Sequence, residues 1–333
     1  TTSRAMTDAS NKILVTGGRG FIGAAVVKAL SRSGFPAISG VRNPASPPAV
    51  ACDLDDTKQI RPALFDVSLV VHAAYGDVGA MPRQCGNLLE AMAGSGSNSL
   101  VYFSSIAVYG AREGRVVESD GPVGTLDAYA SGKIACEQQV RAWAEDPAHP
   151  DRRAIILRPG IVYGRGSRYW IDRLAQRIRA GVWGDFGEAG EGVAALIHID
   201  DLADLVSRAA LRLSNIDRAA LPRVVTLNAV GAETPTWNAY FDALAGALGA
   251  PALPSLSAAM LARRAPLALA AKVWRRLGLP GFERQALIPA AGELALFARK
   301  ANYDTGAAQA LLGFAPSVSM LDGIQRSLPQ AKR

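Results

Sequence analysis

The segment Val15-Thr16-Gly17-Gly18-Arg19-Gly20-Phe21-Ile22-Gly23 constrains the fold more than any other feature of this sequence. It follows a run of apolar, largely β-branched residues and precedes a helical pattern, so it is predicted to join a strand to a helix. There Gly17 permits a tight turn, Gly20 lets the backbone approach a pyrophosphate, and Gly23 lets the helix pack closely on the strand. The start of the helix offers oriented N–H donors to an anion. The pattern therefore predicts a dinucleotide site, with a ligand-free glycine turn as the alternative.

Short apolar runs alternate with helical patterns along the first half of the chain. Strands are expected at 13–16, 37–41, 69–73, 100–104 and 154–157, with helices from 21, through 88–92 and over 129–143. This alternation predicts an α/β fold with a doubly wound, parallel Rossmann sheet. The segments 194–199 and 224–227, with a helix from 200 between them, are expected to return to that sheet. The helical stretches 236–248 and 256–277 are rich in Ala and Leu, and predict a smaller, mostly helical substrate lobe.

We accordingly divide the chain into two units, taking Met6 as the natural start. Residues 6–158 and 194–230 are expected to form the NADP-binding Rossmann domain, and residues 159–193 and 231–333 the substrate-binding lobe.

Composition narrows the class of protein. The chain has 333 residues, of which 49% are hydrophobic, so it can bury a full core. Its net charge of +7 comes from scattered arginines, which favours a basic surface suited to anionic cofactors over nucleic-acid binding. The three cysteines and three histidines lack metal-site spacing, so neither a metal nor a disulfide framework is expected. No long apolar run or secretory signal is evident, and we expect a cytoplasmic protein without an integral membrane segment.

The end of the second expected strand bears on the choice of cofactor. It reads Gly40-Val41-Arg42-Asn43, without the carboxylate that usually binds the ribose 2′-hydroxyl of NAD. Arg42, together with Arg19, can instead pair with the 2′-phosphate of NADP, because a guanidinium offers a forked donor to phosphate oxygens. NADP(H) is therefore the expected cofactor. NAD(H) is the alternative if both arginines are merely exposed.

Tyr129 and Lys133 are the expected chemical centre. They are four residues apart on one helix, so their side chains share a face. A phenol titrates near pH 10 or so, and an ammonium beside it favours the phenolate, so Tyr129 can exchange a proton with a carbonyl or alcohol oxygen. Ser104 and Ser105 lie at the end of the expected strand 100–104, on the edge where doubly wound sheets bind their ligands.

The remaining chemistry-bearing residues receive structural interpretations. His72 and His198 lie at apolar strand ends, and we expect packing or backbone hydrogen bonding for both. Cys136, one turn beyond Lys133, is interpreted as a small core residue.

Taken in order, these motifs resemble the extended short-chain dehydrogenase/reductase family, within the NAD(P)-dependent epimerase/dehydratase superfamily. Within that superfamily, the motifs most resemble those of the branch that contains 3β-hydroxysteroid dehydrogenases and ketoreductases. The segments that carry the resemblance are the glycine loop, Asp53-Leu54, His72-Ala73-Ala74, Ser104–Gly110, Tyr129-Ala130-Ser131-Gly132-Lys133, Arg158–Gly164 and His198–Ala203.

The resemblance implies roles for these residues. Ser105 would polarise the substrate oxygen, with Ser104 as the fallback, and Lys133 would also bind the nicotinamide ribose. Asp53-Leu54 would contact the adenine, and 72–74 would pass the cofactor's ribose. A homodimer through helices that include 129–143 is a family-level expectation. The full set of implied cofactor contacts is Gly17, Arg19, Gly20, Phe21, Ile22, Gly23, Arg42, Asn43, Asp53, Leu54, His72, Ala73, Ala74, Tyr129, Lys133, Pro159, Ile161 and Val162.

Two departures from that family bear on the substrate. Enzymes of nucleotide sugars usually carry Arg-x-x-Asn after the sixth strand and an arginine four residues before the His-x-Asp-Asp motif. Here the first reads Arg158-Pro159-Gly160-Ile161 and the second position is Ala194. A diphosphate buried without polar partners is costly, so these losses weigh against a nucleotide sugar. The Arg-Pro form and the segments 302–305 and 312–316 look more like the steroid dehydrogenase and ketoreductase branch.

Two further segments leave alternatives open. The segment 256–279, with interspersed Arg and Lys, could roof a pocket, form a core helix pair or make a basic amphipathic surface that touches lipid. The segment 75–87 is shorter than in typical members, and the Asn that commonly supports the catalytic water would fall near Met81.

We therefore expect an NADP(H)-dependent oxidoreductase that interconverts a ketone and a secondary alcohol on a relatively apolar small molecule. The alternative is a nucleotide-sugar epimerase or dehydratase. A second alternative is a non-catalytic NADP(H)-sensing protein, against which the intact Ser, Tyr and Lys set argues.

Overall fold

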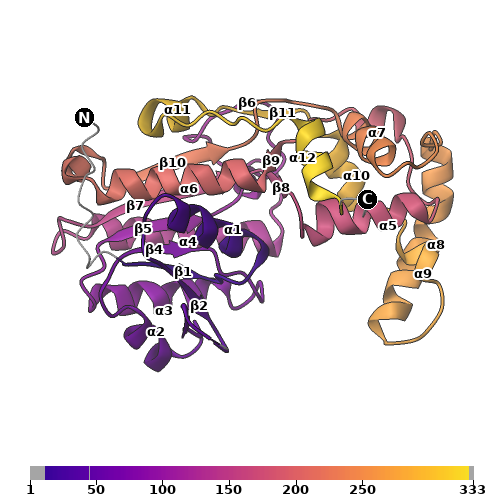
Figure 1. Ribbon diagram of the computed structural model, residues 1–333. Helices are drawn as coiled ribbons and strands as arrows, with labels where there is room; N and C mark the ends of the chain where they lie inside the picture. Colours follow the sequence, from indigo (N-terminus) through magenta and orange to yellow (C-terminus); the bar gives the residue numbers. More distant parts are fainter. Residues whose placement is uncertain (1–11, 45, 330–333) are drawn as a thin grey trace.

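The computed structural model describes residues 12–44 and 46–329, so Met6 lies outside the described residues. A seven-stranded, all-parallel sheet occupies one half of the molecule, in the order β10-β7-β5-β4-β1-β2-β3 (Figure 1). The predicted doubly wound α/β class is confirmed. The strands are β1 (Lys12–Thr16), β2 (Ala37–Val41), β3 (Ala49–Ala51), β4 (Val67–His72), β5 (Ser99–Phe103), β7 (Arg153–Pro159) and β10 (Val224–Ala229).

Helices cover both faces of this sheet. Ile13 and Val15 of β1 pack in one core with α1 (Phe21–Arg32) and α6 (Ile199–Ser214). Leu14 points the opposite way, into a second core. The helices over that face are α2 (Thr57–Ala63), α3 (Met81–Ala93) and α4 (Ala128–Glu145). Strands buried on both faces explain why the expected strands are continuous apolar runs rather than alternating ones.

The chain leaves the sheet at Gly160, directly after β7. A Cβ at Gly160 would lie 2.2 Å from the carbonyl oxygen of Ala195, and the Ile161 N–H donates to that same oxygen at 2.7 Å. Strand β8 (Ile161–Tyr163) therefore turns away and pairs with β9 (Leu196–His198) in a separate two-stranded sheet. The prediction that 194–199 rejoins the main sheet is wrong for this reason. Strand β10 does rejoin it, beside β7.

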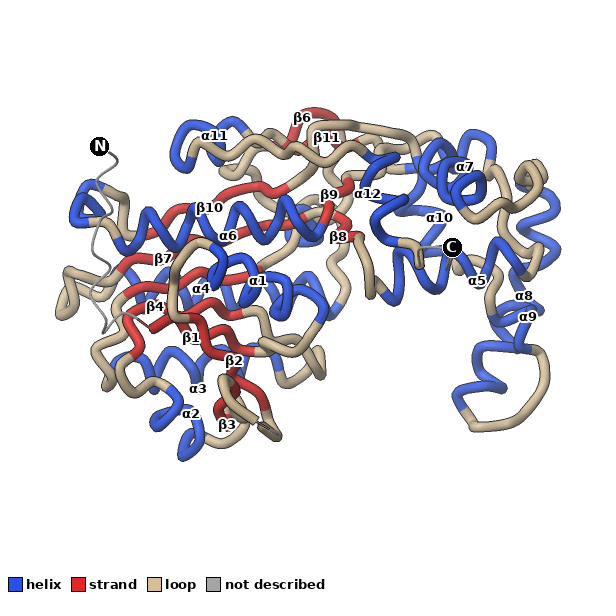
Figure 2. Tube along the Cα trace, in the orientation of Figure 1, coloured by secondary structure: helices blue, strands red, loops and turns tan. Residues whose placement is uncertain are grey.

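A mostly helical lobe lies beside the carboxyl end of the sheet (Figures 1 and 2). Its core is a cluster of aromatic rings, among them Trp183, Trp237, Phe241 and Phe297. A short parallel pair, β6 (Gly114–Val116) with β11 (Ala301–Tyr303), links the two halves. The helices of the lobe are α5 (Arg173–Arg179), α7 (Trp237–Ala247), α8 (Ala258–Arg276), α9 (Glu283–Ala286), α10 (Ala291–Ala298) and α12 (Met320–Ser327).

The short helix α11 (Gly306–Leu312) differs from the expected division of the chain, which assigned it to the substrate lobe. Its residues Ala308 and Leu312 are buried in the same core as α6, because their apolar face has that helix and β10 to pack against. Among the described residues, no helix is both long enough and apolar enough to cross a bilayer.

Candidate active site

The glycine loop lies between the ends of β2 and β4. Gly17 adopts a φ of +68°, and a Cβ there would lie 2.7 Å from the Cα of Ala74. Its N–H donates to the carbonyl of Gly40 at 2.9 Å. A side chain on Gly23 would collide with the carbonyl oxygen of Gly17, at 2.2 Å. Only glycine fits these two positions, and the loop, the start of α1 and residues 72–74 lie together.

His72 fastens β1 to β4 beside this loop. Its Nδ1 is 2.8 Å from the Thr16 hydroxyl, which in turn accepts from the Ala74 N–H at 3.3 Å. Burial, together with the nearby charge of Lys133, lowers the pKa of His72 to about 3, so the imidazole is neutral. His198 has a comparable task, since its Nδ1 accepts from the Asp200 N–H at the start of α6. Both histidines therefore support the backbone, although His72 does so through a side chain rather than by a direct backbone bond.

The residues expected at the adenine end lie on the same edge of the sheet. Arg19, Arg42 and Asn43 are exposed there. Leu54 is buried and its carbonyl accepts from Asn87 at 2.9 Å, which fixes the segment that follows β3. The other expected contacts, Pro159, Ile161 and Val162, occupy the end of β7 and strand β8.

One negative charge stands near Arg42. A hydrogen bond from Gln84 and the ion pair with Arg83 hold the pKa of Asp55 below its ordinary value, and the charge of Arg42 contributes to this shift. The carboxylate of Asp55 therefore offsets part of the positive charge of Arg42.

Ser105 and Tyr129 meet at the carboxyl end of β5. The side chain of Asp127 accepts from the Ala130 N–H at 2.7 Å and starts α4 just before Tyr129. The Ser105 side chain is close enough to the Tyr129 hydroxyl to influence its titration. Burial raises the pKa of Tyr129 above its ordinary value, and Ser105 opposes that rise. The sequence suggested that Lys133 favours the phenolate, whereas burial has the larger effect here and holds the phenol in the protonated form.

Lys133 lies in the same α4 face, one turn after Tyr129. Its ammonium donates to the Phe103 carbonyl at 2.7 Å and stands 5.8 Å from the centre of the Tyr129 ring. Burial lowers the pKa of Lys133 to about 8, so it still carries a proton at neutral pH. The arrangement places a hydroxyl, a phenol and an ammonium together at the strand end.

Ser104 forms part of a buried polar network that the sequence did not predict. Its hydroxyl donates to Glu137 at 2.5 Å, and Glu137 forms a two-bond ion pair with Arg158 at 2.9 and 2.7 Å. Arg158 also donates to the Tyr109 hydroxyl, which donates to Asn228 at 2.6 Å. One signal was available: Glu137 is four residues beyond Lys133 and so lies on the same side of α4. Ser105, rather than Ser104, is the serine left facing Tyr129.

A cavity of about 420 Å³ lies in the helical lobe. It is lined by Arg168, Asp172, Arg173, Gln176, Arg275, Ala286 and Leu287. Tyr169, in the π-helical turn Arg168–Asp172, is close enough to Tyr75 to influence its titration. Tyr75 in turn packs edge-on against Tyr129, with ring centres 5.7 Å apart. The cavity has three arginines, none of which was predicted as a site residue.

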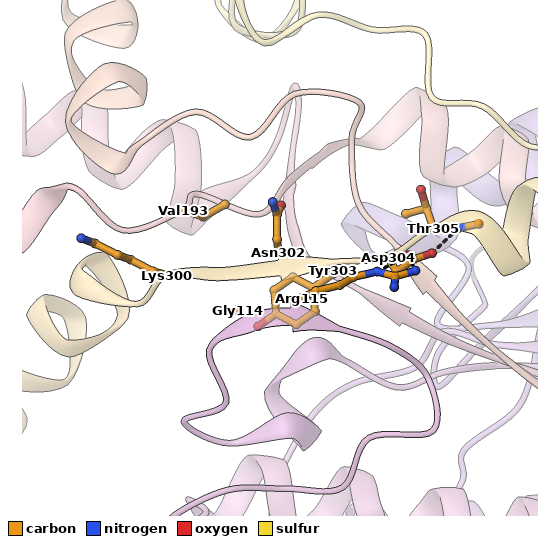
Figure 3. A pocket seen from close by; sticks show the side chains of 9 residues that line it. Gly114, Arg115, Val193, Lys300, Asn302, Tyr303, Asp304 and Thr305 are labelled. Atoms are coloured by element: carbon orange, nitrogen blue, oxygen red, sulfur yellow. Dashed lines mark hydrogen bonds and ion pairs between the residues drawn. The ribbon is translucent and has the colours of Figure 1, made fainter.

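A larger cavity of about 670 Å³ runs along β11 (Figure 3). Lys300, Asn302 and Thr305 line it, and an ion pair of 2.6 Å between Arg115 and Asp304 closes one side. It contains none of the residues predicted to act on cofactor or substrate, and we assign it no role.

Three other predicted positions are apolar contacts. Ala194 is fully buried, and Met81 packs against Gly132, beside Lys133. Cys136 is buried, as predicted, and pairs with Cys85 through a thiol hydrogen bond. In the described part of the chain, no group of three or more His, Cys, Asp or Glu side chains is placed to hold a metal ion.

Comparison with known proteins gives a family match. Residues 13–221 match the family model described as "NAD dependent epimerase/dehydratase family". A UDP-glucose 4-epimerase of Azospirillum brasilense is 31% identical over 249 residues, which are 62% of this chain and 70% of that protein. A ceramide reductase of Caulobacter vibrioides is 26% identical over 252 residues, or 73% of each chain. Three of the relatives are named UDP-glucose 4-epimerase, and several others are named as reductases.

Solved structures share the fold at low identity. A UDP-N-acetylglucosamine 4-epimerase of Bacillus cereus superposes with a TM-score of 0.69 at 20% identity, over 95% of this chain and 97% of that one. The human epimerase family protein SDR39U1 with NADPH gives a TM-score of 0.68 at 19% identity, over 95% and 98%.

The buried network yields a stability prediction. Glu137→Ala leaves the Arg158 guanidinium buried without its carboxylate, and should lower the free energy of unfolding by about 3–5 kcal/mol. Asp204→Ala is the matched control, because it removes the partner of the exposed Arg208 on α6 and should change stability by less than about 1 kcal/mol. Urea denaturation of both variants measures the difference. Equal losses would show that burial of the Glu137 pair is unimportant.

Proposed function

The chain belongs to the NAD-dependent epimerase/dehydratase family, and we propose that it transfers hydride between a nicotinamide cofactor and a substrate carbon that alternates between alcohol and ketone. The observation that carries the proposal is the meeting of Ser105, Tyr129 and Lys133 at the carboxyl end of β5, directly beside the glycine loop. A protein that only sensed the cofactor would have no use for that set.

Each residue has a distinct task. The protonated Tyr129 donates its proton to the carbonyl oxygen as hydride reaches the carbon, and takes a proton back when the alcohol is oxidised. The Ser105 hydroxyl, which lies near Tyr129, holds the same substrate oxygen. The Lys133 ammonium favours the phenolate left after donation. Moving from the Phe103 carbonyl to a ribose hydroxyl would position the cofactor as well.

The residues around the glycine loop fit a dinucleotide. The approach of Gly17 and Gly23 to neighbouring backbone leaves the start of α1 without side chains in the path of a pyrophosphate. We propose NADP(H) as the preferred cofactor, because Arg42 and Arg19 are exposed on the edge where a 2′-phosphate would lie.

Cofactor affinity tests this preference. NADPH should bind about 10- to 100-fold more tightly than NADH, and Arg42→Ala should remove most of the gap. Arg61→Ala, at an exposed arginine paired loosely with Glu90, is the control and should leave the ratio unchanged. Titration of intrinsic fluorescence with both cofactors measures it, and equal affinities in the unaltered chain would refute the assignment.

Tyr129→Phe tests the chemistry. The variant should bind cofactor normally but lose turnover by about a hundredfold or more, because only the acid/base hydroxyl is removed. Tyr75→Phe keeps the ring contact with Tyr129 and should retain turnover within about threefold. Steady-state rates with matched binding titrations separate the two, and a nearly normal rate for Tyr129→Phe would exclude the proposed role.

The substrate is the second part of the proposal. A nucleotide sugar is the better supported class, because relatives named as UDP-glucose 4-epimerases share the family, and because the arginine-lined cavity offers partners for a diphosphate. The apolar ketone favoured by the sequence is the second candidate. It is supported by two apolar residues, the fully buried Ala194 and Ile161. They occupy the positions where enzymes of nucleotide sugars usually carry the polar residues that hold the diphosphate.

Calorimetry of the cofactor complex separates the two classes. UDP-glucose should bind, and Arg173→Ala should weaken it about tenfold or more, because a guanidinium contact to phosphate is removed. Arg179→Ala, exposed on the same helix, should have little effect. Bound sugar should be epimerised without net consumption of NADPH. The apolar class would replace this reading if UDP-glucose failed to bind and affinity across a ketone series rose by up to about 0.8 kcal/mol per methylene.

A further inference from the structure

Exposed apolar side chains concentrate in one part of the helical lobe. Eight of the fourteen large hydrophobic residues that the described structure leaves exposed lie between residues 260 and 282. They are Met260, Leu267, Leu269, Val273, Trp274, Leu277, Leu279 and Phe282. We call residues 258–286, which comprise α8, the following loop and α9, the α8 limb. Figure 1 shows this limb projecting from the lobe, away from the sheet.

The exposed residues of α8 share one side of the helix. At 100° per residue, Leu269, Val273 and Leu277 form one stripe, and Met260, Leu267 and Trp274 form the stripe beside it. The opposite side is buried through Leu261, Ala268 and Ala271, and packs toward the lobe. The helix is therefore anchored on its inner side and apolar on its outer side. A surface helix normally presents polar residues to water. The outer face of α8 is instead apolar, and it has no apolar partner within the described structure.

The charges of helix α8 all have one sign. No Asp or Glu occurs between Asp242 and Glu283, whereas five cationic residues do. Around the helix, Arg264 and Arg276 fall at the two borders of the apolar face. Lys272 and Arg275 fall on the inner side, where Lys272 lies in the field of Glu293 and Arg275 in that of Glu283. The fifth, Arg263, lies within the face, where a long side chain can extend its charge toward water or phosphate.

Aromatic residues mark the outer end of the limb. The Trp274 indole N–H donates to the Pro280 carbonyl at 2.9 Å, and its ring packs edge-on against Phe282 with centres 6.0 Å apart. This contact folds the loop back on α8 and keeps Leu277 and Leu279 together with the two rings at the surface. Tryptophan is the residue type most suited to the boundary between headgroups and acyl chains.

We propose that the α8 limb binds the surface of an anionic membrane, with the α8 axis parallel to the bilayer. The outer face of α8 enters the boundary of the acyl chains, and the bordering cations meet lipid phosphates. Charge selects this occupant. A second copy of the limb would add cations of the same sign to Arg263, Arg264 and Arg276, whereas an anionic bilayer complements these three. The proposal does not depend on the reaction or the substrate.

Sedimentation of the full chain with vesicles tests the proposal. Vesicles of phosphatidylcholine with one third phosphatidylglycerol should bind at least about tenfold more strongly than phosphatidylcholine alone. Leu269→Glu/Val273→Glu should reduce that binding about tenfold or more. Leu211→Glu/Leu321→Glu is the matched control, because those leucines are 61% and 58% exposed on α6 and α12, and it should leave binding unchanged.

Two further measurements keep the outcome decisive. Arg264→Gln/Arg276→Gln should remove most of the preference for anionic vesicles, with circular dichroism confirming an unaltered fold. Trp274 emission should shift to shorter wavelength on binding, and Trp274→Phe should abolish the shift. Absence of vesicle binding, or equal loss in the control pair, would overturn the proposal. Self-association that Leu269→Glu/Val273→Glu abolishes, without vesicle binding, would replace the membrane by a second copy.

Discussion

The buried ion pair between Glu137 and Arg158 fixes the geometry of the candidate site. Glu137 lies one turn after Lys133 on α4, and Arg158 lies on β7 just before the chain leaves the sheet. Ser104 joins the pair from the end of β5, and Tyr109 carries it on to Asn228 in β10. Separation of the two charges would leave both of them buried without a partner, so the pair holds α4, the ends of β5 and β7 and the exit at Gly160 in one arrangement.

Burial then sets the protonation states at that unit. It keeps the Tyr129 phenol protonated and the His72 imidazole neutral, while Lys133 retains its charge at neutral pH. The three groups therefore differ in charge at neutral pH, and under the proposed function Tyr129 and Lys133 have different tasks. The same low-polarity surroundings that make these groups costly to charge also strengthen the bonds among them.

The helical lobe begins where the chain leaves the main sheet. Gly160 lets β8 turn toward β9, and the π-helical turn and α5 follow β8 along the chain. Two of the three arginines of the cavity come from this region: Arg168 begins the turn, and Arg173 directly follows it. The excess positive charge of the chain is likewise uneven, because the stretch between Asp242 and Glu283 carries five cations and no acidic residue.

The sequence by itself determined the features that depend on short spacing. The glycine loop, the alternating strands and helices, and the pair Tyr129 and Lys133 follow from local backbone geometry and from the periods of helix and strand. Tertiary structure alone decided which serine faces Tyr129, where 194–199 pairs, and which arginines share a cavity. Each of these rests on contacts between distant residues, as between Tyr109 and Asn228, 119 positions apart. No local pattern encodes such a contact, because its partner is chosen by the packing of the whole sheet and lobe.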